Sequence, residues 1–192
     1  WLDKPGTRGP VCLDDFRRIG RRICDALTYA HGKNVVHRDL KPENVLVTGD
    51  LKDIKVVDFG IAQILDPDGH YTQKAGGHTP YYAAPEQVKG AKTDHRADIY
   101  SLGIMFCEIL TGDVPYAGSP PPSKKRKDMP AKLDEILAKA TAEDPNQRWT
   151  KVAEFWEAVE QALDEAIVDP GYVPEQTGAT DTARLHICTP CL

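Results

Sequence analysis

The chain has 192 residues, of which 41% are hydrophobic and 28% are charged. This length supports one ordinary domain with a sizeable core or two very small ones, and the composition excludes collagen-like, coiled-coil and wholly disordered proteins. The net charge of −5 offers no support for a nucleic-acid partner or an anionic membrane surface. Because the first residue is Trp1 rather than a methionine, we expect the chain to be a piece of a longer protein.

The N-terminal part is predicted to be a loop followed by an amphipathic helix. Residues 1–10 are rich in Pro and Gly, which is typical of a loop. Apolar residues then recur at helical spacing from Leu13 to Ala30, which predicts a helix over 12–31. Gly32 is well placed to end this helix.

Three short strand-like runs follow, at residues 35–36, 45–47 and 54–57. The last two are separated by Thr-Gly-Asp at residues 48–50, a turn signal. We therefore expect the second and third runs to pair as a hairpin.

The remainder is predicted to be one long loop and three helices. Residues 61–95 are weakly periodic and rich in Gly, His, Pro and Asp, and a loop of that length inside a domain is usually functional. Residues 96–111 are apolar almost all round, which predicts a buried central helix. A further helix is expected over 133–140, and Thr150 is a plausible N-cap for the last helix. Residues 169–192 carry few large apolar side chains and are predicted to be a linker or disordered tail.

The five cysteines do not form the pattern of a disulfide framework, because their number is odd and they are scattered. Cys188 and Cys191 form a CxxC pair, but no second pair accompanies them, so an incidental tail is favoured over a zinc or redox site. The best candidate for a membrane span, residues 99–110, is too short and contains Glu108. The first residues lack the apolar stretch of a signal peptide.

The most informative segment is His-Arg-Asp-Leu-Lys-Pro-Glu-Asn at residues 37–44. Asn44 stands at the base of the first hairpin strand, and the hairpin returns the chain so that Asp58 lies beside it. Asp39, Asn44 and Asp58 then offer oxygen ligands around one small volume, which is what Mg²⁺ requires. Gly60 gives backbone freedom where the following loop departs.

These motifs resemble the protein kinase family. Residues 37–44 are similar to the family's catalytic loop, Asp-Phe-Gly at 58–60 to its magnesium loop, and Ala-Pro-Glu at 84–86 to the end of its activation segment. The resemblance covers roughly residues 10–166 and is strongest to bacterial-type Ser/Thr kinases. It implies a mainly α fold with a small β-hairpin region, the C-terminal lobe of a kinase over 1–166, and a linker or disordered tail over 167–192.

The resemblance also implies a role for each residue of the motifs. Asp39 would accept or orient the substrate hydroxyl, and Asn44 and Asp58 would hold Mg²⁺, or Mn²⁺ in its place. Lys41 would contact the γ-phosphate of ATP, and its position favours Ser/Thr over Tyr substrates. Leu46 would lie under the adenine ring, so ATP and a divalent cation are the expected cofactors.

The activation segment carries two further candidates. Thr79 would lie next to Asp39, in the loop that receives the substrate residue after the acceptor. Arg38 would bind a phosphate on this segment, and Thr72 is the best phosphosite because it lies mid-loop. Gln63 departs from the family pattern, because many relatives carry a basic residue there that would share the phosphate.

Other motif residues would support the site rather than react. Asp98 would brace the catalytic-loop backbone from the buried helix, and Arg148 would pair with Glu86. The full set of supporting residues is His37, Arg38, Phe59, Gly60, Glu86, Asp98 and Arg148.

The N-terminal lobe of the family is expected to be absent from this chain. No G-x-G-x-x-G precedes the catalytic loop, and neither a Val-Ala-Ile-Lys strand nor a helix carrying its Glu partner is present. The groups that grip the α- and β-phosphates are therefore missing, and we expect little or no activity from the chain alone.

Three functions remain open. The leading one is an enzyme, the large lobe of a Ser/Thr protein kinase; the second is a pseudokinase-like docking module, which the intact catalytic residues disfavour. The third is a small-molecule kinase of the aminoglycoside type, disfavoured by the Lys-Pro pair at 41–42 and by the Ala-Pro-Glu motif. The basic run at 124–127 is interpreted as a solvated loop rather than a nuclear-import signal or an acidic-partner patch.

The expected partners are protein substrates with Ser or Thr acceptors and no nucleic acid, in a cytoplasmic location. Any membrane contact would come from parts of the parent outside this chain, and the oligomeric state is left open.

Overall fold

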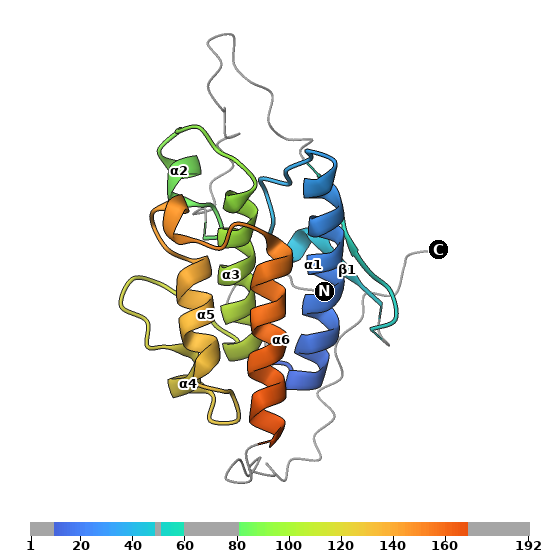
Figure 1. Cartoon of the computed structure of the whole chain (residues 1–192), viewed down its shortest axis with the longest axis vertical. Coiled ribbons are helices and arrows are strands. Elements are labelled where there is room, and N and C mark those ends of the chain that lie inside the picture. The colour runs from blue at the N-terminus through green and yellow to red at the C-terminus, as the bar shows by residue number, and fades with distance from the viewer. Residues whose placement is uncertain (1–9, 49–50, 60–80, 169–192) are drawn as a thin grey trace.

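The computed structural model describes residues 10–48, 51–59 and 81–168. This part of the chain is mostly helical, with one antiparallel two-stranded sheet at its edge (Figure 1). The elements are α1 (Leu13–Gly32), η1 (Pro42–Asn44), β1 (Val45–Val47), β2 (Ile54–Val56), α2 (Pro85–Val88), α3 (Arg96–Thr111), α4 (Pro122–Lys125), α5 (Lys132–Ala140), η2 (Pro145–Gln147) and α6 (Val152–Val168).

Helix α3 is the centre of the fold. Between Ala97 and Leu110 every side chain except that of Tyr100 is buried, as expected for a helix that is apolar nearly all round. Helices α1 and α5 pack against α3, and α6 closes the bundle by packing on both of them (Figure 1). The predicted buried central helix is therefore confirmed. None of the described helices is both long and apolar enough to cross a bilayer.

An aromatic core joins α1, α3 and α6. It consists of Phe16, Phe106, Phe155 and Trp156, and Gly20 lies against the Trp156 ring. The rings of Phe16 and Phe106 meet edge to face at 5.0 Å between centroids, and those of Phe106 and Phe155 stack at 5.6 Å. A Cβ atom on Gly20 would lie only 2.4 Å from the Trp156 ring, so glycine allows α6 its close approach to α1.

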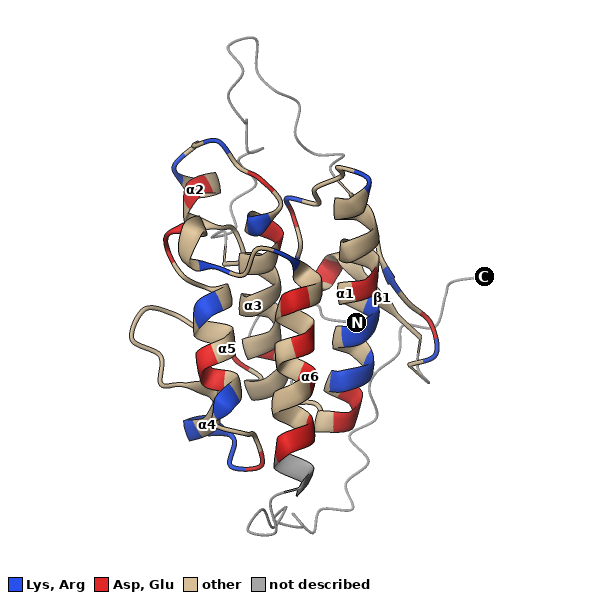
Figure 2. Cartoon of the chain, in the orientation of Figure 1, with Lys and Arg blue, Asp and Glu red and all other residues tan. Residues whose placement is uncertain are grey.

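Opposite charges also face each other across α1 and α6. Figure 2 shows basic residues on α1 beside an acidic stripe on α6. Arg17 pairs with Asp164, and Arg21 pairs with Glu160. These pairs are partly solvent-exposed, so each contributes little beyond the apolar packing beneath it.

The hairpin forms as predicted between β1 and β2, with Val45 opposite Val56. Val45 is buried in the core, whereas Leu46 and its cross-strand partner Lys55 are exposed on the other face. The turn residues 49–50 lie outside the described residues.

The prediction of a strand at residues 35–36 is wrong, because this segment follows the end of helix α1 and pairs with neither described strand. The Val35 N–H donates to the Ala30 carbonyl at 2.9 Å, and Asn34 has a left-handed backbone with φ of 59°. These features complete the helix C-terminus, so the N–H of Val35 is used there and not in a sheet.

Two other boundaries differ from expectation. The described part of the predicted loop 61–95 contains the short helix α2, which begins with Pro85 at its first position. Helix α6 begins at Val152, and the Thr150 hydroxyl donates to the Glu154 carboxylate at 2.6 Å instead of capping the backbone. The expected loop before residue 10 and the expected tail over 169–192, with its cysteine pair, lie outside the described residues.

Candidate active site

Asp98 of α3 holds the backbone of the catalytic loop, as the resemblance implied. Its carboxylate is fully buried and accepts the backbone N–H of His37 at 2.8 Å and that of Arg38 at 2.7 Å. The imidazole Nε2 of His31, at the end of α1, lies 2.8 Å from the same carboxylate. Because a carboxylate only accepts, His31 carries the proton on Nε2 in this contact.

The catalytic loop is strained at Arg38, where both the backbone N–H and the carbonyl are hydrogen-bonded to side chains. Arg38 has φ of 65°, a left-handed conformation that costs a non-glycine residue of order 1 kcal/mol. Its N–H donates to Asp98, and its carbonyl accepts from the Gln87 side-chain amide at 2.7 Å. We call His31, His37, Arg38, Gln87 and Asp98 the catalytic-loop network. It fixes the direction in which the next side chain, Asp39, leaves the backbone.

Asp39, Lys41 and Asn44 lie together in the structure. The Lys41 ammonium lies 2.8 Å from the Asp39 carboxylate, and the Asn44 amide donates to the Asp39 carbonyl at 2.7 Å and to its carboxylate at 3.3 Å. Asn44 is 5% exposed, whereas the Asp39 side chain is 51% exposed. An oriented carboxylate that faces solvent can accept a proton from a hydroxyl brought to it.

The hairpin carries Asp58 to the same region. The Val57 N–H donates to the Asn44 carbonyl at 2.9 Å, so Asp58 follows directly after a residue bonded to Asn44. Asp58 also has a left-handed backbone, with φ of 60°. His37 supports this position twice, because its Nε2 lies 2.8 Å from the Val57 carbonyl and its ring packs on Phe59 at 4.7 Å.

The chemistry of Asn44 and Asp58 suits a hard cation. The Asn44 amide nitrogen donates to Asp39, which leaves its Oδ1 as an acceptor, and Asp58 is an exposed carboxylate. Over the described ranges, no set of three or more His, Cys, Asp or Glu side chains is arranged to hold a metal ion. Two oxygen ligands fit Mg²⁺, which keeps several waters and binds phosphate oxygens instead of filling an all-protein cage.

Arg148 and Glu86 form the pair that the motifs predicted. Two parallel bonds of 2.7 Å join the guanidinium to the carboxylate, and both side chains are at least nine-tenths buried. The guanidinium also lies over the Tyr100 ring at 4.9 Å. Its remaining donors reach the carbonyls of Arg96, Ala142 and Glu143. This pair ties α2, and with it Gln87, to the turn after α5.

Sequence reasoning missed four polar residues that position the site. His31 and Gln87 belong to the catalytic-loop network, and Tyr82 donates to the buried Glu108 at 2.5 Å. The only sign in the sequence was Glu108 itself, a carboxylate within an otherwise apolar helix.

The remaining sequence candidates, Gly60, Thr72 and Thr79, lie outside the described residues. In the basic run 124–127, Lys125 pairs with Asp113 at 3.0 Å and Arg126 with Asp128 at 2.7 Å. Arg126 also donates to the carbonyls of Val11 and Leu110. Two of the four basic side chains thus make contacts within the fold.

The family model of the protein kinase domain matches residues 5–168. The chain belongs to the protein kinase family. Curated relatives include the serine/threonine-protein kinase Pkn1 of Myxococcus xanthus, 35% identical over 87% of this chain, and PknB of Mycolicibacterium smegmatis, 37% identical over 78%. The chain spans only about a quarter of the length of these relatives, 26% in each case.

The fold is that of solved protein kinases. The crystal structure of the PknI kinase domain of Mycobacterium tuberculosis matches with a TM-score of 0.64 and 32% identity. The match covers 80% of this chain and 57% of the PknI domain. The mostly helical architecture with one antiparallel hairpin is therefore that expected from the sequence, a kinase C-terminal lobe.

Proposed function

We propose that this chain is the large lobe of a protein kinase that transfers the γ-phosphate of ATP to Ser or Thr hydroxyls of proteins. The observation that carries the proposal is the Asp39–Lys41–Asn44 cluster on a backbone held by Asp98. The Ser/Thr kinase names of the curated relatives support the same acceptor class.

In this proposal Asp39 acts on the acceptor. Its carboxylate accepts the hydroxyl proton as that oxygen bonds to the γ-phosphorus and the bond to ADP breaks. Lys41, 2.8 Å from Asp39, places a positive charge where the transferring phosphoryl group would lie. Asn44 holds Asp39 in place through its amide nitrogen.

Asn44 and Asp58 would hold the magnesium ion, and Leu46 would contact adenine. A bound Mg²⁺ supplies charge neutralisation on the phosphates. Asn44 offers Oδ1 and Asp58 offers its carboxylate on the adjacent hairpin strand. Leu46 is 55% exposed on β1, so its side chain is open to a ligand. Thr79 would contact the substrate beside Asp39, and phosphorylated Thr72 would bind Arg38.

The 192 residues would have little activity by themselves. They contain neither the Gly-rich loop nor the strand lysine and helix glutamate that position ATP, and positioning supplies most of the catalysis of phosphoryl transfer. We further propose that the chain works in the cytoplasm on protein substrates.

The test restores the missing groups. A chimera with the N-terminal lobe of the PknI kinase domain joined before Trp1 should phosphorylate casein on Ser and Thr. Asp39→Asn should lower that rate by about 10²–10⁴-fold because the proton acceptor is lost. Asp25→Asn, an equal change at an exposed carboxylate on α1, should have no effect.

Two outcomes would contradict the proposal. A folded, ATP-binding chimera with no transfer would favour a docking module. A chimera whose transfer rate is unchanged by Asp39→Asn would refute the role of Asp39 as proton acceptor. If the isolated chain forms ADP and Asp58→Ala abolishes this, only the prediction that the isolated chain is inactive would be refuted.

A further inference from the structure

The peptide plane that precedes Asp39 is hydrogen-bonded at both ends. Its carbonyl, that of Arg38, accepts from the side-chain amide of Gln87 at 2.7 Å. Its N–H, that of Asp39, lies 3.3 Å from Nδ1 of His37, which accepts because Nε2 of the same ring donates to the Val57 carbonyl. A peptide unit is planar, so bonds at its two ends fix its orientation. Gln87 and His37 together therefore set the direction in which the Asp39 side chain leaves the backbone.

The amide of Gln87 is also bonded on its other side. Its Oε1 accepts the backbone N–H of Ala84 at 3.0 Å, while its Nε2 donates to the Arg38 carbonyl. Ala84 is the N-cap of α2, so the first of these bonds is the backbone half of a capping box. One side-chain amide thus connects the catalytic loop to the end of the predicted activation segment.

The Ala84 end of this connection is itself anchored. Tyr82, two residues earlier, is buried and bonded to α3 at two points. Its hydroxyl donates to Glu108 at 2.5 Å, and its carbonyl accepts from the Ser101 hydroxyl at 2.8 Å. Two residues later, Glu86 is held in the buried ion pair described above. Gln87 therefore joins the catalytic loop to a segment whose place on α3 is already fixed.

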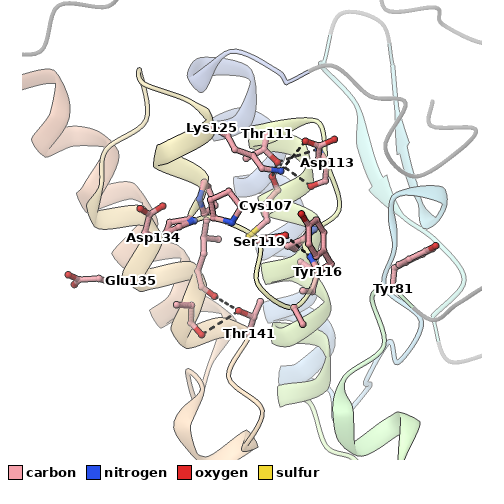
Figure 3. A pocket seen from close by; sticks show the side chains of 18 of the residues that line it. Tyr81, Cys107, Thr111, Asp113, Tyr116, Ser119, Lys125, Asp134, Glu135 and Thr141 are labelled. Carbon is pink, nitrogen blue, oxygen red and sulfur yellow. Dashed lines mark hydrogen bonds and ion pairs between the residues drawn. The ribbon is translucent and has the colours of Figure 1, made fainter.

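Capping of α2 does not explain why this residue is a glutamine. A glutamate serves a capping box equally well, because the cap needs only an acceptor oxygen. At neutral pH, however, a carboxylate would turn a second acceptor toward the Arg38 carbonyl, whereas an amide donates there. Nor does Gln87 shape the cavity between α3 and α5, which Tyr81 lines and Gln87 does not (Figure 3). The bond to the Arg38 carbonyl is thus the feature that requires an amide.

We propose that Gln87 is a positioning residue for phosphoryl transfer, which holds the Asp39 carboxylate at a fixed place relative to the segment that receives the substrate. This proposal rests on the proposed function and names a further residue on which the reaction depends. Gln87 acts through the Arg38 carbonyl and not on the substrate. Loss of its donor should therefore slow the chemical step, because the geometry between Asp39 and the acceptor hydroxyl is lost.

The first test uses the 192-residue chain without ATP and follows the two bonds separately by NMR. Gln87→Glu keeps the acceptor oxygen and removes the donor, so the Arg38 carbonyl carbon should shift while the Ala84 amide keeps its protection from hydrogen exchange. Gln87→Met has a similar length and removes both groups, so the Ala84 protection should also be lost. Gln161→Glu is the matched control, because it removes an amide donor to Glu165 on the exposed face of α6 and should leave both signals unchanged.

Acid should restore the missing donor in Gln87→Glu. A protonated carboxyl group has one O–H donor, so the Arg38 carbonyl carbon should move back toward its position in the starting protein as the pH falls. Gln87→Met has no titratable group at this position and should show no such return. A general loss of packing around α2 would not recover in acid, so the return identifies the specific hydrogen bond.

The second test measures kinetics in the chimera with the N-terminal lobe of the PknI kinase domain. Gln87→Glu should lower kcat by about 10–100-fold, since a small misplacement of a reacting group costs a factor of this size. The KM for casein should stay the same, because the bond to Ala84 is kept. Gln87→Met should lower kcat at least as much and should also raise KM, because the segment before α2 is released. Gln161→Glu should change neither constant.

The outcomes separate this proposal from the proposed function. The proposal is overturned if Gln87→Glu leaves kcat of an active chimera unchanged, or if it raises KM as much as Gln87→Met does. It is also overturned if the Arg38 carbonyl carbon does not shift in Gln87→Glu, or does not return in acid. A folded chimera that transfers no phosphate would contradict the proposed function alone. The NMR signals of the 192-residue chain would then decide whether Gln87 holds the Arg38 carbonyl.

Discussion

Asp98 and Phe106 lie on the same helix, and each organises a different region of the molecule. Phe106 is at the centre of the aromatic core and contacts side chains of α1 and α6. Asp98 is at the centre of the catalytic-loop network and contacts only donors. One region is held by non-directional burial of apolar area and the other by directional hydrogen bonds.

This difference predicts how each region responds to substitution. A packed core can tolerate a side chain of similar volume, because burial depends on area and fit. A network of buried donors around one carboxylate cannot tolerate the loss of its acceptor, because each donor then remains desolvated and unpaired. We therefore expect core changes to lower global stability and network changes to alter the catalytic loop locally.

The largest effect is expected in the core, from Phe106→Ala. Phe106 is fully buried and packs against Phe16, Phe155 and Trp156, so truncation leaves a cavity. The free energy of unfolding should fall by about 3–5 kcal/mol, measured by urea denaturation. Tyr29→Ala, at a 72% exposed ring on α1, should change it by less than about 0.5 kcal/mol. A small loss for Phe106→Ala would mean that the core does not carry the stability.

A smaller and more local effect is expected from Asp98→Asn. The substitution removes the negative charge and one acceptor oxygen from the group that accepts hydrogen bonds from His31, His37 and Arg38. The free energy of unfolding should fall by about 2–3 kcal/mol. Hydrogen exchange should show loss of protection at the His37 and Arg38 amides beyond the global change. If amide exchange in Asp98→Asn rises as much in α1, α3 and α6 as at His37 and Arg38, the network unfolds together with the core. The two regions would then not differ in how they respond to substitution.

Packing tolerance in the core is tested by Gly20→Ala. The new methyl group would lie 2.4 Å from the Trp156 ring, so α1 and α6 must shift, at a cost of about 1–3 kcal/mol. Gly32→Ala is the matched control on the same helix, because a Cβ there meets nothing within 4 Å. In thermal unfolding, Gly20→Ala should have a lower Tm than Gly32→Ala. Equal Tm values would show that the α1–α6 contact is loose.

The core was largely predictable from the sequence because its signal is local. Apolar residues recur at helical spacing from Leu13 to Ala30, and the run 96–111 is apolar nearly all round over a length typical of a buried helix. The pair of valines at 35–36 carries too little pattern to separate a strand from the end of a helix. The Val35 N–H donates to the Ala30 carbonyl and so ends the helix there, and hydrophobic periodicity cannot predict such a bond.

The site was predictable in a different way. Asp39, Asn44 and Asp58 were placed by motif and by the hairpin, whose register brings the Val57 N–H to the Asn44 carbonyl. His31 and Gln87 were not found, because their partners lie 67 and 49 residues away along the chain. Contacts at such separations depend on how the helices pack, which hydrophobic periodicity does not determine.

The smallest effect is expected from an ion pair outside both regions, that of Arg126 with Asp128. The hydrogen bond from Arg126 holds the pKa of Asp128 below its usual value. A lowered native pKa stabilises the fold above pH about 4, and this contribution is lost as the pH falls toward the lowered value. Asp128 is partly exposed, so the contribution should be under about 1 kcal/mol.

Urea denaturation of Asp128→Asn and the starting protein at several pH values checks this expectation. The difference in unfolding free energy should be present at pH 7 and should shrink toward zero as the pH falls to about 3. It should also shrink in high salt, since solvent-exposed charges are screened. The bonds from Arg126 to the Val11 and Leu110 carbonyls remain in the variant, so the segment should keep its place. A loss in unfolding free energy as large as that of Asp98→Asn, or one that grows in acid, would contradict this expectation. An exposed carboxylate would then contribute as much as a buried one, and burial would not explain the strength of the catalytic-loop network.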